Sequence, residues 1–131
     1  MTVFQGVSVI PGQGRVVRTL MFIGGTIGIV LGLFLGALYL FGSELASYGA
    51  WGVVSALIAS GYGVFSVTLA ALMGRRKKGV FRGVVAFNVA ASLFPLLFVV
   101  PGDSSSGVPP AFHTVMTGLT FTPRVRAHYG L

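Results

Sequence analysis

The sequence contains no cysteine, and only two of its 131 residues, Glu44 and Asp103, are acidic. Without cysteine there are no disulfide frameworks, no thiol catalysis, and no zinc or iron–sulfur centres that need thiolate ligands. Charged residues make up 8% of the chain and apolar residues 54%, whereas about a quarter of an average soluble domain is charged. This balance argues against an ordinary water-soluble domain.

Three long apolar stretches account for the composition: residues 19–41, 46–73 and 79–100. Each exceeds the roughly 18 uncharged residues that mark a membrane-spanning helix. They are apolar on all sides rather than on one helical or strand face. We therefore expect an all-α integral membrane protein with three spans: a glycine-rich helical hairpin and a third helix kinked at Pro95. The first stretch is too long for a signal-peptide core of about 7–15 residues, so we expect it to remain as an anchor.

Positive charges near the ends of these spans predict the topology. Segment 1–18 and the loop at 74–78 carry cations, as does the start of the third span, whereas the link between the first two spans has none. The positive-inside rule then places segment 1–18 and loop 74–78 together on the cytoplasmic or matrix side. With three spans, residues 101–131 fall on the opposite side. Their turn-rich beginning predicts an irregular extramembrane tail, in which residues around 112–121 could form a short amphipathic helix.

Glycines at four-residue spacing, Gly24, Gly28, Gly32 and Gly36, form a stripe along the first span. Helices in a bilayer associate by close packing, and small residues at this spacing allow it. Two interpretations stay open: the stripe packs against the chain's own helices, or it docks on another subunit. Further small residues predicted to pack helices follow in the second and third spans: Gly52, Ala56, Ser60, Gly79 and Gly83.

This glycine pattern resembles that of helices in the mitochondrial inner-membrane translocase channel family and its related accessory subunits. The likeness covers the first span alone, and that family has four spans where this sequence predicts three.

Polar groups inside the spans are few. Asn88 is the one strongly polar side chain there, and it is expected to make an interhelical hydrogen bond. Arg82, at a span end, is the only ionisable group, which argues against proton translocation. His113 and His128 belong to the predicted tail, where a haem or pigment ligand is not expected. We therefore predict no catalytic residues, no enzyme activity, no metal and no protein-bound cofactor.

A cluster of cations between the second and third spans predicts a site for anionic lipid headgroups rather than for nucleic acid. The expected ligand is a phospholipid, including cardiolipin where the membrane contains it, and no small-molecule substrate is expected. The residues predicted to contact the headgroup are Arg75, Arg76, Lys77, Lys78 and Arg82.

These features favour a non-catalytic accessory subunit of a larger membrane complex, whose partners are lipids and other transmembrane subunits. Small size and an acid-free N-terminal segment favour an energy-transducing assembly, respiratory or ATP-synthesising, in a mitochondrial inner membrane rather than a bacterial plasma membrane. A self-assembling, holin-like pore is the main alternative. A membrane-anchor subunit of a transporter or enzyme is the third.

Overall fold

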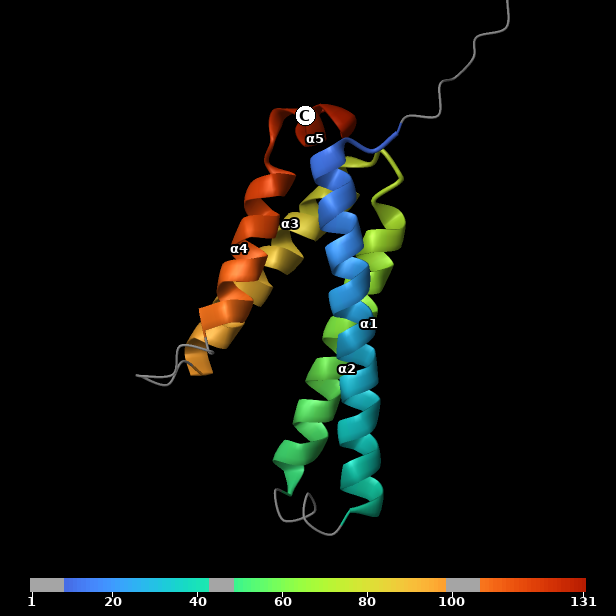
Figure 1. Ribbon diagram of the computed structural model, residues 1–131, viewed down its shortest axis with the longest axis vertical. Coiled ribbons are helices and arrows are strands. Elements are labelled where there is room, and N and C mark those ends of the chain that lie inside the picture. The colour runs from blue at the N-terminus through green and yellow to red at the C-terminus, as the bar shows by residue number, and fades with distance from the viewer. Residues whose placement is uncertain (1–8, 43–48, 99–106) are drawn as a thin grey trace, which may run out of the picture. The chain divides into compact units, whose positions relative to one another are not determined.

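The computed structural model describes residues 9–42, 49–98 and 107–131, and these ranges are helical with short turns (Figure 1). Within these ranges, three helical stretches are long and apolar enough to cross a membrane: α1 (Gly12–Phe41), α2 (Ala50–Leu72) and the stretch Lys78–Leu96. The last comprises α3 (Lys78–Leu93) and the start of the 3₁₀ helix η2 (Phe94–Phe98). The all-α class and the three helices of spanning length and composition are thus confirmed.

The helix boundaries differ from the predicted ones for local reasons. α1 begins at Gly12 rather than at residue 19, because Pro11 starts the helix instead of breaking it: the Arg15 amide donates to the Pro11 carbonyl at 2.9 Å. α3 ends two residues before Pro95 and continues as 3₁₀ turns. Since Pro95 has no amide hydrogen, it ends the α-helical hydrogen-bond ladder there, in place of the expected kink within one helix.

The chain divides into two compact units. Unit 2, Thr19–Ala71, contains most of α1 and α2. Unit 1 comprises Met1–Arg18 and Leu72–Leu131, and so joins the first turns of α1 to α3, η2, α4 (Val108–Thr120) and α5 (Pro123–His128).

In unit 1, α4 returns along α3 (Figure 1). Phe81 on the first turn of α3 contacts the rings of Phe121 and Tyr129, with centroid separations of 5.8 and 5.5 Å. Phe81, Val125 and Tyr129 form a buried cluster. The Tyr129 hydroxyl donates to the carbonyl of Met73 at 3.0 Å, which ties the C-terminus to the loop before α3.

Residues 107–131 are therefore not irregular, and the short helix considered possible around residues 112–121 is present as α4; residues 101–106 lie outside the described ranges. Pro109 and Pro110 stand in the first turn of α4, where proline favours a helix. The short run at 111–121 is stabilised by α3, a partner that its own sequence does not reveal. The bond from Tyr129 to Met73 places the C-terminus beside the basic loop. The expected location of the C-terminus on the opposite side of a membrane stays a prediction.

Candidate functional site

Backbone-to-backbone packing of α1 on α2 within unit 2 depends on glycine. A Cβ on Gly25 would lie 2.9 Å from the Gly63 carbonyl oxygen, and one on Gly28 would lie 3.1 Å from that of Ala59. A Cβ on Gly32 would overlap Ser60, and one on Gly63 would lie 2.5 Å from the Gly25 carbonyl oxygen. Cβ atoms essentially never sit under 3.0 Å from other heavy atoms. The two helices therefore approach each other as closely as small-residue faces in membranes allow.

The predicted small residues of unit 2 are only partly brought together. Gly32 faces Ala56 and Ser60, whereas Gly28 faces Ala59 and Gly63. Gly52 is buried along the same side of α2. Gly24 lies at the margin, where its Cβ would be 3.6 Å from the Tyr62 hydroxyl, and a Cβ on Gly36 would meet nothing within 4 Å. In unit 1, Gly79 is exposed with open space where a Cβ would lie, and Gly83 is half-buried.

The predicted packing residues do not include Gly25 and Gly63, which are both central to the interface. A strict four-residue repeat rotates by about 40° per step on a helix of 3.6 residues per turn, so it drifts off one face. Alternating steps of three and four residues keep one face, and Gly25, Gly28 and Gly32 follow that spacing. A search for this alternating spacing would have identified the stripe of Gly25, Gly28 and Gly32.

Ser66 adds a polar link between the same helices. Its hydroxyl donates to the Met21 carbonyl at 2.8 Å, and the serine is 1% exposed. A serine in a transmembrane helix often bonds its own preceding turn. The bond of Ser66 instead joins α2 to α1.

A second polar link joins α3 to α4 in unit 1. Asn88 is fully buried; its Nδ2 donates to the Val84 carbonyl at 2.9 Å, and its Oδ1 lies 2.9 Å from Nδ1 of His113. Because Oδ1 can only accept, Nδ1 of His113 carries the hydrogen. The rings of Phe87 and Phe112 meet the imidazole edge-on. His113, which was predicted to lie in a tail, is thus a buried interhelical residue.

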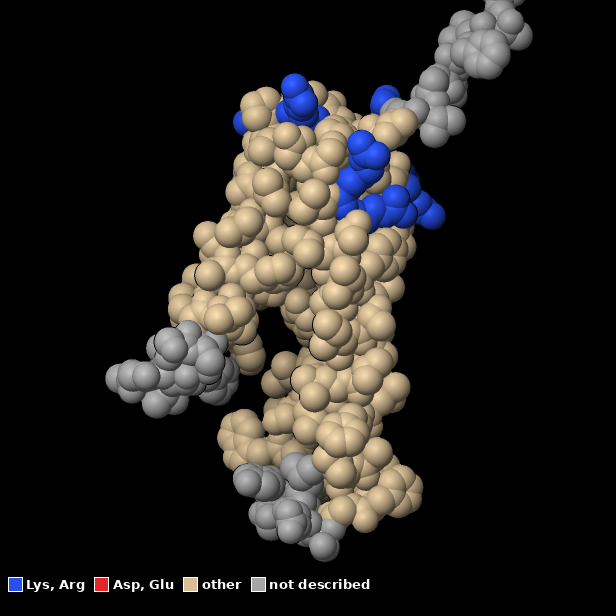
Figure 2. Space-filling view, viewed as in Figure 1, with Lys and Arg blue, Asp and Glu red and all other residues tan. Residues whose placement is uncertain are grey.

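The nine Lys and Arg residues all belong to unit 1. Figure 2 shows these side chains gathered at one end of unit 1, which we call the basic end. The five predicted headgroup residues are exposed there.

α5 brings Arg124 and Arg126 to the same loop, because Tyr129 bonds Met73 and the Lys78 side chain lies 3.9 Å from where a Gly130 Cβ would be. Both acidic residues lie outside the described ranges, so no described carboxylate side chain offsets this charge. The basic-end residues are Arg15, Arg18, Arg75, Arg76, Lys77, Lys78, Arg82, Arg124 and Arg126.

Two titratable side chains are buried beside these cations. Burial lowers the pKa of His128, and the positive charge of Arg76 lowers it further, while a hydrogen bond with the Met73 backbone partly opposes both effects. Burial raises the pKa of Tyr129, and Arg18 partly offsets that rise. His128 is 8% exposed, and its Nε2 has no hydrogen-bond partner in the part of the chain that the structure describes. Both side chains are therefore neutral at pH 7.

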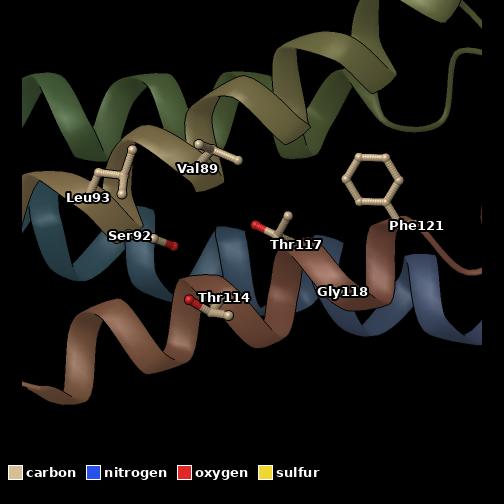
Figure 3. Close-up of a pocket in the computed structure, with 7 residues that line it drawn as sticks. All are labelled: Val89, Ser92, Leu93, Thr114, Thr117, Gly118 and Phe121. Atoms are coloured by element: carbon tan, nitrogen blue, oxygen red, sulfur yellow. The ribbon is translucent and has the colours of Figure 1, made fainter.

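A groove of about 350 Å³ runs between α3 and α4 and opens to the surface (Figure 3). Three of its residues carry hydroxyls, but each donates back to its own helix. Ser92 bonds the Asn88 carbonyl at 2.9 Å, and Thr114 and Thr117 bond the carbonyls four residues before them at 2.8 Å. The groove therefore presents a mainly apolar wall. Its lining residues are Val89, Ser92, Leu93, Thr114, Thr117, Gly118 and Phe121.

Within residues 9–42, 49–98 and 107–131, no three His, Cys, Asp or Glu side chains form a group that could hold a metal ion. No protein-family model, curated protein or solved structure matches the chain.

Proposed function

We propose that this chain is a non-catalytic accessory subunit of a larger membrane complex, with its basic end bound to anionic lipid headgroups. The observation that carries the proposal is the narrowness of the buried stripe on α1 and α2. In the most apolar 18-residue segment of each helix, only 22% of the residues are buried within the chain. Most of the perimeter of both helices is left for lipid tails or for helices of other subunits.

Large apolar side chains cover that perimeter. On α1, Ile27 is 60% exposed and Leu33 is 67% exposed; on α2, Leu57 and Phe65 are each 66% exposed. A helix that is apolar all round belongs in a membrane or inside a large assembly. Because the contacted glycines are already occupied by α2, partner helices would dock on these larger side chains rather than on Gly28 and Gly32.

The basic end supports a membrane-surface role. A juxtamembrane Lys or Arg gains about 1 kcal/mol from an anionic leaflet, and this end carries nine such residues with no described carboxylate side chain among them. Phospholipid phosphate, including that of cardiolipin, is the complementary ligand.

An energy-transducing complex of a mitochondrial inner membrane, respiratory or ATP-synthesising, is the assembly we favour. The support is the chain's small size and an N-terminal region free of acidic residues through Ser43.

The test is extraction of the chain from its native membrane in mild detergent, followed by native electrophoresis and mass spectrometry of the band that contains it. Migration with many different subunits supports the proposal, and those subunits identify the complex. Migration alone or as a homo-oligomer overturns it and favours the self-assembling pore.

A further inference from the structure

We propose that the groove between α3 and α4 holds one acyl chain of an anionic phospholipid whose phosphate lies at Arg82. The inference rests on the proposed function in placing this chain in a membrane, and it names a single lipid site there. The volume of about 350 Å³ is at the small end of the roughly 300–1,000 Å³ of small-molecule sites.

The wall of the groove suits an alkyl chain. The hydroxyl hydrogens of Ser92, Thr114 and Thr117 are all donated to their own helices, so none of them is available to a polar ligand. Val89 and Leu93 line the α3 side, and Phe121 lies at one end of the groove (Figure 3). A polar ligand would give up its hydrogen bonds with water here and gain few in return, whereas an alkyl chain has no such bonds to give up.

Charge is concentrated beyond one end of this wall. On an α-helix, residues seven and eleven positions apart return to within about 20° of the same direction. Arg82 therefore lies in line with Val89 and Leu93, and it is exposed. On the other side of the groove, Arg124 follows three residues after Phe121. A lipid phosphate at Arg82 would meet a cation, and its tail would continue directly along Val89 and Leu93.

The distance along α3 from Arg82 to the far end of the groove matches one leaflet. From Arg82 to Leu93, α3 rises by about 16 Å at 1.5 Å per residue, and half of a hydrocarbon core is about 15 Å thick. A lipid with its headgroup at the basic end would therefore end its tail near Leu93. A free phosphate would occupy the cations without filling the groove, so the ligand expected here is a lipid.

Gly118 offers a direct way to close the site. No heavy atom lies within 4 Å of where its Cβ would be, so a larger side chain can enter the groove without displacing the protein. Gly61, on α2, has equally open space outside the groove and provides the matched control.

The experiment uses the full chain in phosphatidylcholine nanodiscs that contain a minor fraction of phosphatidylglycerol with a photoreactive diazirine on one acyl chain. Labelled positions are mapped by mass spectrometry after illumination. We expect labelling to concentrate on the groove, to fall roughly tenfold with Gly118→Leu, and to persist with Gly61→Leu. Arg82→Gln should remove the preference for this probe over the same diazirine on phosphatidylcholine.

Labelling spread evenly over the exposed faces of α1 and α2, or insensitive to Gly118→Leu, overturns the proposal, as does equal labelling by both probes. A disulfide-linked dimer of Gly118→Cys after oxidation would place a second copy in the groove and would also overturn it. These readouts do not depend on partner subunits. A chain that migrates alone yet shows the labelled groove therefore refutes only the proposed function, and a large native complex with an unlabelled groove refutes only the lipid site.

Discussion

Asn88 and His113 stand 25 residues apart in sequence, yet their side chains meet at 2.9 Å in the buried interface between α3 and α4. Each comes from a different helix, and Asn88 also bonds its own helix through Nδ2. The pair therefore fixes the register of α4 on α3 in a way that apolar contacts alone would not.

A double-mutant cycle measures this pair. We expect Asn88→Ala and His113→Ala each to destabilise unit 1, with a coupling energy of about 0.6 kcal/mol and at most about 1.7 kcal/mol, as for other interhelical hydrogen bonds in membranes. The measurement is reversible unfolding in mixed micelles. Asn88→Ala combined with Arg126→Ala, at the far end of the helix pair, should be additive within about 0.5 kcal/mol. A coupling of zero for the first pair would contradict the assignment.

Packing of α1 on α2 is tested at two glycines that differ only in their surroundings. Gly63→Ala places a methyl against the Gly25 backbone and should cost about 1–3 kcal/mol through overpacking. Gly61→Ala meets open space and should be neutral or stabilising by up to about 1 kcal/mol. Unfolding in micelles compares the two variants, and equal effects would refute the close approach of the helices.

The positions of the termini and loops can be tested with single cysteines, because the natural chain has none. We expect Arg75→Cys and Ala127→Cys to react with an impermeant maleimide from the same side of sealed vesicles, and Ala50→Cys from the other. The reason is that α5 lies against the loop before α3, while α2 separates that loop from residue 50. Reaction of Ala127→Cys from the side of Ala50→Cys would restore the topology first predicted from the sequence.

Acid should loosen the docking of α5. Because folding lowers the pKa of His128, the unfolded segment binds a proton more readily than the folded one. The docked state of α5 therefore has its full stability only above the ordinary histidine pKa of about 6.5. That full stability is lost as the pH falls from there through the lowered value. The hydrogen-exchange rates of the α5 amides, corrected for intrinsic rates, should rise as the pH is lowered from 7.5 to 5.

His128→Asn should weaken this pH dependence, since the titrating group is gone. Persistence of the full dependence in that variant would assign it to another group.

The three apolar helices were predictable because length and hydrophobicity are properties of a single segment. Gly28 and Gly32 were recognisable from spacing, but the strict four-residue rule included Gly36, which has open space where a Cβ would lie, and left out Gly25. α4 was not predictable in the same way. At 13 residues, about 20 Å long, it is too short to span a membrane alone, and its buried residues His113 and Met116 matter only because α3 is there to meet them.

Unit 1 is assembled from both ends of the sequence, since Val125 lies 3.6 Å from where a Cβ on Gly14 would be, and Tyr129 holds the Met73 carbonyl. Its N-terminal segment is synthesised before unit 2 and the rest after it. Unit 2 can pair its helices while α4 and α5 are still to be made, whereas the basic end is complete only after α5 has been synthesised. A tag fused after Leu131 would therefore extend from the basic end, and it is the tag most apt to disturb the proposed binding of lipid headgroups there.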